Sequence, residues 1–124
     1  MNKSVKNFLI DLKNNSLNNK SCFKRTCNSN ILKIVSILYN EGFLQSFKLE
    51  DNVLIIYFNK SGGINFLKNL KIVSKLSRRV YLQYRDICKI KDNGSLLLFS
   101  TTKNILTIHD CKRKRVGGEL LLKI

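Results

Sequence analysis

Apolar residues in the first third of the chain recur at the spacing of two amphipathic helices. Each set follows the i, i+3, i+4, i+7 pattern that lines one helix face, and the sets are Val5, Phe8, Leu9 and Leu12, then Ile31, Ile34, Val35 and Leu38. The first set predicts a helix over about residues 3–14, ended by the Asn-rich stretch 14–19. For the second helix, Asn28 or Ser29 can serve as the N-cap and Gly42 as the C-terminal cap.

Shorter apolar runs between and after these helices predict strands. Residues 21–26 contain Phe23 and are expected to form a short strand. Residues 43–49 and 53–58 flank Glu50-Asp51-Asn52 and are expected to form a β-hairpin with a three-residue loop. The order helix, strand, helix, strand, strand predicts two helices packed on a three-stranded sheet.

The Ser61-Gly62-Gly63 triplet is the best boundary signal and predicts two subdomains, 1–62 and 63–124. The second subdomain is expected to be rich in β-structure, with short helices. Its expected elements are strands over 64–73 and 80–84, helical turns over 85–91, and strands over 95–100 and 119–124. A further short helix is expected to begin with Thr107 as its N-cap and to end at Gly117. Together the patterns predict an α+β protein.

The charge of the chain points to the kind of partner. The 23 Lys and Arg residues outnumber the 8 Asp and Glu residues, giving a net charge of +15, whereas a small soluble domain needs a magnitude of only about 2–8. Residues 63–124 carry +10 and residues 1–62 carry +5. Such a field favours nucleic acid or an anionic membrane. A membrane role is disfavoured, because neither predicted helix joins a basic face to interfacial aromatic residues and no apolar run reaches the ~18–20 residues of a membrane span.

Hydroxyl residues and a lysine follow the apolar run 96–99, in the sequence Ser100-Thr101-Thr102-Lys103. Such a loop can offer hydroxyls, backbone N–H groups and one cation to a phosphate–sugar backbone. Further along, Gly117-Gly118 lets the main chain approach another surface closely, and we expect these residues to place the last strand against this loop. Glu119 is an isolated acid in a basic tail, better suited to accept hydrogen bonds from loop donors or a base edge than to face phosphate.

A second basic segment, 74–81, reads Ser-Lys-Leu-Ser-Arg-Arg-Val-Tyr. Its cations form a dense positive turn in which each Arg can donate two hydrogen bonds to a phosphate, and Tyr81 can either contact RNA by stacking or pack in the sheet. A third basic run, 112–115, is expected to distribute phosphate contacts along a short helix. The predicted RNA-binding residues are Ser74, Lys75, Arg78, Arg79, Tyr81, Ser100, Thr101, Thr102, Lys103, Lys112, Arg113, Arg115, Gly117, Gly118 and Glu119.

These motifs resemble those of the bacterial and organellar small-subunit ribosomal protein eight family. The family carries a Ser-Thr-Ser-Lys-Gly loop, a Gly-Gly-Glu near its C-terminus and a Leu-x-x-Glu-Gly-Phe segment, matched here by 100–104, 117–119 and 38–43. Asn104 replaces the Gly of the loop, and Leu76-Ser77 replaces the Pro-Gly of the family's basic turn. The resemblance implies a structural constituent of the small ribosomal subunit that binds the central domain of its RNA, mainly through shape and backbone contacts, and assists assembly. It also implies neighbouring small-subunit proteins as partners and no cofactor.

The sequence leaves two other functions open: a messenger-RNA-binding translational regulator, and a basic nuclease built on His109 and Asp110. An enzyme is not expected, because His109 is the only histidine and the acids are scattered without an obvious pair. The four cysteines are expected to be reduced and mostly buried. A zinc site of Cys22, Cys27, His109 and Cys111 would match no common finger spacing.

Composition also bears on origin. The chain has no Ala, Pro or Trp but 17 Lys, 15 Asn and 13 Ile, a bias toward residues with A/T-rich codons. An A/T-rich organelle genome fits this bias, and no Arg-rich and Ser-rich transit peptide precedes the first predicted helix. Synthesis inside the organelle is consistent with this, and so is a mature chain from which such a peptide has been removed. We expect an organelle-encoded protein of a mitochondrial ribosome, with a plastid ribosome as the alternative.

Overall fold

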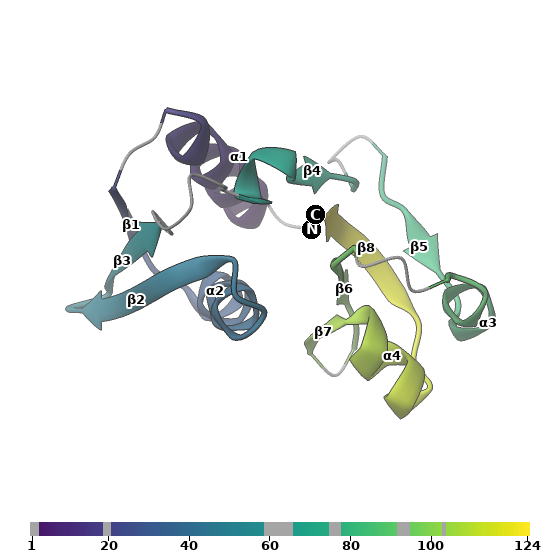
Figure 1. Cartoon of the computed structure of the whole chain (residues 1–124). Helices are drawn as coiled ribbons and strands as arrows, with labels where there is room; N and C mark the ends of the chain where they lie inside the picture. The colour runs from purple at the N-terminus through teal and green to yellow at the C-terminus, as the bar shows by residue number, and fades with distance from the viewer. Residues whose placement is uncertain (1–2, 19–20, 59–65, 75–77, 92–94, 103) are drawn as a thin grey trace. The chain divides into compact units, whose positions relative to one another are not determined.

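The computed structural model describes residues 3–18, 21–58, 66–74, 78–91, 95–102 and 104–124. They form four α-helices and eight strands in two antiparallel sheets, so the predicted α+β class is confirmed (Figure 1). The chain divides into two compact units: residues 7–69 form the N-terminal unit, and residues 70–124 with 1–6 form the C-terminal unit. The expected boundary triplet 61–63 lies outside the described residues. Within the described ranges, no helix is long and apolar enough to cross a membrane.

The N-terminal unit places two helices on one side of a three-stranded sheet (Figure 1). Its elements are α1 (Lys3–Leu17, from residue 7 on), β1 (Cys22–Thr26), α2 (Ser29–Asn40), β2 (Leu44–Glu50), β3 (Val53–Phe58) and the 3₁₀ turn η2 (Phe66–Asn69), with strand order β1-β3-β2. Phe23 on β1 and Phe47 on β2 both pair with Ile56 on β3. Phe23 also stacks on Phe8 of α1, and Phe47 meets Tyr39 of α2 edge-on. The face of the sheet that carries Ile56 is therefore the core face.

Helix α2 begins and ends where the sequence indicated. The Asn28 side-chain oxygen accepts a hydrogen bond of 2.9 Å from the backbone N–H three residues on, so Asn28 is the N-cap. At the other end Gly42 has φ of +85°, and the N–H groups of Gly42 and Phe43 bond to the carbonyls of Tyr39 and Leu38. This is a Schellman motif, which favours a glycine at the left-handed position that Gly42 fills.

The predicted end of α1 was wrong. The helix continues through the Asn-rich stretch to Leu17. Asn15 donates a hydrogen bond of 2.7 Å back to the Asp11 carbonyl, and Ser16 is buried. The Asn15 side-chain bond and the backbone hydrogen bond from the Asn18 N–H to the Asn14 carbonyl thus continue the helix through this polar stretch despite its weak helix propensity.

The predicted length of the hairpin loop was also wrong. Glu50 pairs with Val53, so the loop contains only Asp51 and Asn52. These two residues have φ of +47° and +64°. Two consecutive left-handed residues form a type I′ turn, whose twist matches that of the flanking strands and which accepts Asn and Asp readily.

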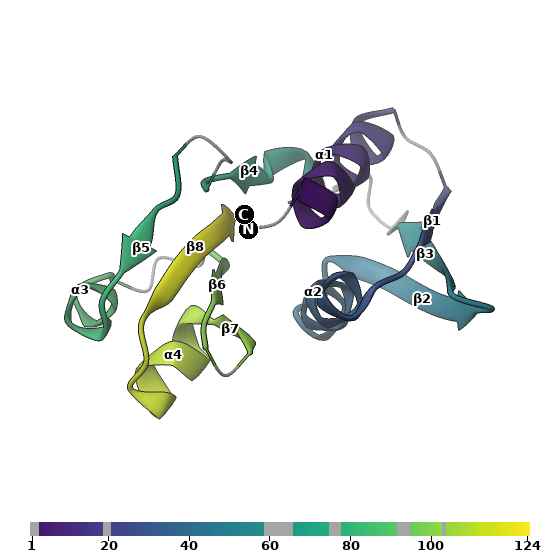
Figure 2. The same cartoon turned by 180° about the vertical axis from the view of Figure 1, so that it is seen from behind.

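The C-terminal unit is built around its last strand. Its elements are β4 (Lys71–Ile72), β5 (Tyr81–Leu82), α3 (Tyr84–Cys88), β6 (Leu97–Ser100), β7 (Ile105–Thr107), α4 (Ile108–Lys114) and β8 (Gly118–Lys123). Strand β8 pairs with β6 on one side and with β4 and then β5 on the other, and β7 lies beyond β6 (Figure 2). The last strand, β8, is thus the centre of the sheet. Strands β4, β5 and β6 pair with it directly, and β7 is joined to it through β6.

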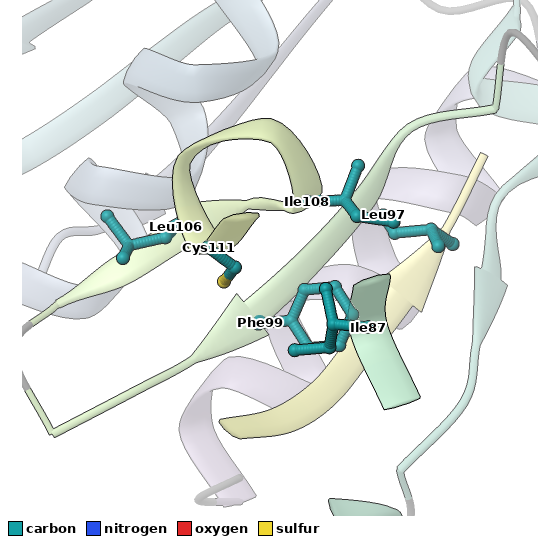
Figure 3. Close-up of a cluster of buried hydrophobic side chains, with 6 residues drawn as sticks. All are labelled: Ile87, Leu97, Phe99, Leu106, Ile108 and Cys111. Carbon is teal, nitrogen blue, oxygen red and sulfur yellow. The ribbon is translucent and has the colours of Figure 1, made fainter. Parts of the chain in front are cut away.

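Two helices and four strands contribute to the core of the C-terminal unit. Buried side chains from α3, α4, β6 and the β7–α4 segment meet in one cluster, which contains Ile87, Leu97, Phe99, Leu106, Ile108 and Cys111 (Figure 3). Leu82 and Leu120 pack against this cluster from β5 and β8. The core therefore covers one face of the sheet, while Leu98 and Leu122, which pair with each other outside this cluster, are also fully buried.

Two predictions for the second half were wrong in extent. The expected strand over 64–73 contains, in its described part, η2 and the two-residue β4. Leu67 and Leu70 are fully buried at the three-residue spacing of a 3₁₀ turn.

The last helix begins after the predicted N-cap Thr107, whose hydroxyl accepts from the backbone N–H of Asp110. It ends at Arg115, whose φ is +57°, rather than at Gly117.

Candidate nucleic-acid interface

The loop between β6 and β7 is held by hydrogen bonds between its two ends. The Thr101 hydroxyl donates to the Asn104 carbonyl at 2.7 Å and accepts from the Asn104 N–H at 3.1 Å. The Thr101 N–H donates to the same carbonyl at 2.9 Å, and the Asn104 side-chain oxygen accepts from the Ile105 N–H at 3.0 Å. Asn104 therefore closes the loop with both its backbone and its side chain.

The predicted loop residues have different roles. Thr101 holds the loop together, whereas Thr102 is exposed and Ser100, the last residue of β6, is half-buried. Lys103 lies outside the described residues. Sequence reasoning missed the role of Asn104 in holding the loop. The available signal was the Thr-x-x-Asn spacing, because a Thr hydroxyl can bond backbone groups three residues on.

The Gly117-Gly118 pair brings β8 close to two other segments. One of them is the start of the loop between β6 and β7, where close approach was expected from the sequence. A Cβ on Gly118 would lie 2.5 Å from the Ser100 carbonyl oxygen. A Cβ on Gly117 would lie 2.6 Å from the Leu82 carbonyl oxygen and 2.9 Å from the Tyr84 nitrogen. Real side chains do not approach backbone this closely, so both positions require glycine and their role is to permit packing.

Ser100, Glu119 and Tyr81 stand side by side on three neighbouring strands. Ser100 of β6 pairs with Glu119 of β8, and Glu119 pairs with Tyr81 of β5. Paired residues of antiparallel strands point to the same face, and the residues next in line, Phe99 and Leu120, belong to or pack on the core. The three side chains, called here the Ser100–Glu119–Tyr81 row, therefore lie on the face opposite the core. Within the row Tyr81 is 64% exposed and Glu119 only 6%.

Arg79 adds a cation to this row. A side-chain hydrogen bond with Tyr81 raises the pKa of the Arg79 guanidinium above its ordinary value, and the negative charge of Glu119 adds to the effect. Arg79 and its neighbour Arg78 are both exposed. The row and Arg79 thus combine a hydroxyl, a buried carboxylate, an exposed aromatic ring and an exposed positive charge.

Ser74, the first residue of the basic segment 74–81, is buried and does not face solvent. Its side chain is fully buried, and its hydroxyl donates to the Leu120 carbonyl at 2.5 Å and accepts from the Val80 N–H at 3.0 Å. The Leu120 N–H in turn donates to the Val80 carbonyl. The prediction of direct RNA contact by Ser74 is corrected on this ground: the side chain can only position the turn. Lys75 lies outside the described residues.

The basic run on α4 splits into residues that are tied down and residues that are exposed. The Lys112 ammonium donates to the Ile90 carbonyl at 2.9 Å, which joins α4 to the end of α3. Arg113 forms an ion pair of 2.8 Å with Asp110, while Arg115 is exposed. The Asp110 carboxylate considered for a nuclease is therefore engaged with Arg113. Among the described residues, no group of three or more His, Cys, Asp or Glu side chains is placed to hold a metal ion.

Comparison with known proteins gives a consistent result. The sequence model of the family described as ribosomal protein S8 matches residues 3–124. The small ribosomal subunit protein uS8c of Tetradesmus obliquus is 31% identical over 134 aligned positions, covering 100% of this chain and 98% of the relative. Protein uS8m of Acanthamoeba castellanii is 34% identical over 75% of this chain and 76% of its own length. Protein uS8 of Oleidesulfovibrio alaskensis is 33% identical over 73% of this chain and 72% of its own length.

Proposed function

The chain belongs to the ribosomal protein S8 family, and we propose that it binds small-subunit ribosomal RNA through the Ser100–Glu119–Tyr81 row and the basic residues around it. Family membership makes the chain a structural protein of the small ribosomal subunit, at work in translation. The proposal adds the surface that meets RNA and the chemistry of the contact. The single observation that carries it is the row itself, in which motifs from three separate segments meet on one face of the sheet.

Each member of the row suits a different part of an RNA strand. The Glu119 carboxylate can accept hydrogen bonds from a 2′-hydroxyl or a base amino group, neither of which carries negative charge. The exposed ring of Tyr81 offers a surface for a ribose or base. Arg79 can fork two hydrogen bonds to a phosphate, and it lies beside Tyr81. A surface with these groups reads shape and backbone more than base sequence.

Attraction over longer distances comes from the charge of this half of the chain. Residues 63–124 carry +10, and the exposed cations nearest the row in sequence are Arg78 and Arg79. Arg115 lies at the end of α4, also exposed. Phosphate neutralisation by such residues supplies most of the salt-dependent affinity for RNA. The target we propose is the central domain of the small-subunit RNA, whose helical segments the protein would hold together early in assembly.

Filter binding of the whole chain to a central-domain RNA fragment tests this proposal, with a scrambled duplex of equal length as the comparison. Tighter binding to the central-domain fragment at near-physiological salt is expected. The Tyr81→Ala variant should lose that preference, whereas Tyr39→Ala, which removes an exposed ring from α2, should keep it. The Lys103→Ala variant should reduce the dependence of log affinity on log salt by about one. Equal affinity for both RNAs would refute the proposed specificity.

We further propose that the ribosome in question is organellar and, of the two organelles, mitochondrial. The A/T-rich residue usage supports an organelle genome, and similar proteins carry mitochondrial (uS8m) and plastid (uS8c) names. Sucrose gradients of detergent-lysed mitochondria and plastids, probed with an antibody to this chain, distinguish the two. The chain should sediment with the mitochondrial small subunit in high salt. Release from the subunit under those conditions would instead favour a translational regulator.

A further inference from the structure

The central strand of the N-terminal sheet is apolar on both of its faces. Strand β3 reads Val-Leu-Ile-Ile-Tyr-Phe; Leu54, Ile56 and Phe58 are buried, while Val53, Ile55 and Tyr57 alternate with them. An antiparallel sheet with one solvated face normally alternates apolar and polar residues, and a continuously apolar strand is typical of a strand covered on both faces. Here Val53 and Tyr57 are each 37% exposed. The outer face of this sheet therefore has the composition of a surface that another molecule covers.

The strands on either side place lysines next to this apolar stripe. In register, Ile55 lies between Lys24 of β1 and Lys48 of β2, and both lysines are exposed. Their Cα atoms are about 10 Å apart, because neighbouring strands are about 4.8 Å apart. Tyr57 lies between the small residues Cys22 and Ser46. The Tyr57 ring is therefore flanked by short side chains. On each neighbouring strand a lysine lies two residues further along, on the same face.

One acid shares this face, and it does not cancel the lysines. Glu50, paired with Val53, forms an ion pair of 2.6 Å with Lys48, and the two side chains are 53% and 60% exposed. Lys48 and, more weakly, Lys24 lower the pKa of the Glu50 carboxyl. An ion pair this exposed contributes little stability, so Lys48 can exchange Glu50 for a phosphate. The face then presents two cations and one aromatic ring beside an apolar stripe.

We propose that this outer face of the N-terminal sheet is a second RNA-contact surface, which takes an unpaired stretch of RNA. A base stacks on the Tyr57 ring, and Lys24 and Lys48 neutralise the phosphates on either side. Aromatic rings on an open sheet with flanking cations are a general solution for binding single strands, because every base has a face to stack. The surface lies in the other compact unit from the Ser100–Glu119–Tyr81 row. This second surface rests on the proposed ribosomal function but does not depend on the Ser100–Glu119–Tyr81 row.

Fluorescence anisotropy with a labelled oligouridine of roughly ten nucleotides, a length within the range bound by single-strand platforms, tests this surface. The measurement uses the whole chain in the Tyr81→Ala background, so that the row contributes less to binding. Adding Tyr57→Ala should weaken binding about 5- to 150-fold, the usual effect of losing one stacked base. Tyr57→Phe should retain the affinity, because stacking needs the ring and not the hydroxyl. Tyr39→Ala is the matched control, because it removes a comparably exposed ring from α2.

Two further variants keep the test decisive if Tyr57→Ala unfolds. Lys24→Ala and Lys48→Ala change exposed side chains, and each should reduce the salt dependence of oligouridine binding by about 0.7, the contribution of one phosphate contact on a single strand. Unchanged salt dependence in both lysine variants overturns the proposal. So does equal affinity of a folded Tyr57→Ala variant, which would leave a protein neighbour as the other candidate occupant of the face. Neither result would alter binding to the central-domain fragment, so failure here is distinguishable from failure of the row.

Discussion

Gly118 lies against Ser100 so closely that a Cβ on Gly118 would be 2.5 Å from the Ser100 carbonyl oxygen. The same Cβ would also approach the Thr101 side chain at 3.0 Å. The next residue, Glu119, pairs with Ser100 across the sheet. The absence of a side chain at Gly118 is thus what lets the C-terminal motif and the hydroxyl loop form one surface.

Gly118→Ala should therefore destabilise the protein by about 1–3 kcal/mol, the usual cost of forcing an extra group into packed surroundings. The contact is with backbone, so β6 or β8 has to move, and the β6–β8 register at Ser100 is the first pairing to be lost. Urea unfolding followed by circular dichroism measures the change. Thr102→Ala is the control, since Thr102 is exposed at the same end of the sheet and should change stability by less than about 0.5 kcal/mol. A Gly118→Ala protein as stable as this control would show that the backbone yields without cost.

Removal of the Ser74 hydroxyl should cost about 1–3 kcal/mol, because the Val80 N–H loses its buried acceptor. Ser74→Ala should also weaken binding to the central-domain RNA by loosening the basic turn, yet leave its salt dependence unchanged, since no charge is removed. Ser36→Ala is a matched control: its hydroxyl donates only to the Leu32 carbonyl within α2. A reduced salt dependence in Ser74→Ala would contradict the positioning role and favour a displaced phosphate contact.

The comparison of Ser74 with α2 shows what a sequence can and cannot predict here. Helix α2 follows from local information alone: a four-residue apolar stripe, an Asn cap and a Gly stop lie within fifteen residues. The burial of Ser74 depends on the Leu120 carbonyl, 46 residues away in the chain. Serine by itself is compatible with an exposed turn or a buried bridge, so only the pairing of β8 decides between them.

The difference between local signals and contacts distant in the sequence also separates the correct from the incorrect parts of the site prediction. The meeting of Ser100 with Gly118 was predictable, because doubled glycines indicate close backbone approach and the loop follows a clear strand pattern. The row itself was not predictable, since a strand of only two residues, β5, sets the register that places Tyr81 beside Glu119. Strands this short have no detectable alternation of apolar and polar residues.

Cys111 makes the stability of the C-terminal unit depend on pH at the alkaline end. Burial in the core, with a smaller effect from Asp110, raises the pKa of this thiol from 9.0 to about 11. The folded state therefore holds the proton more tightly, so this contribution is fully present below about pH 9 and is lost as pH rises through about 11. Between about pH 8 and about pH 10.5 the difference amounts to about 2 kcal/mol.

Urea unfolding at these two pH values, compared between the unaltered chain and Cys111→Ala, isolates this effect from the many other groups that titrate. Cys111→Ala is expected to be less stable at neutral pH because it leaves a small cavity, but to lose about 2 kcal/mol less on going to alkaline pH. Cys22→Ala, which removes a half-buried thiol from the N-terminal unit, is the control. Parallel behaviour of Cys111→Ala and the unaltered chain would mean that the buried thiol does not contribute.

The sign of the effect of Glu119→Gln on RNA binding tests how the row works. If Glu119 accepts hydrogen bonds from uncharged RNA groups and helps to hold Arg79, removing its charge should weaken binding roughly 10- to 100-fold, as expected for a hydrogen bond to a charged group. If phosphates passed close to the carboxylate, the same change would relieve repulsion and strengthen binding. Because Glu119 is nearly buried between Ser100 and Tyr81, we expect the loss. Filter binding to the central-domain RNA measures the change in affinity. Glu41→Gln is the control, because Glu41 is an exposed acid at the end of α2. A gain in affinity for Glu119→Gln alone would place phosphate at the centre of the row and refute this role.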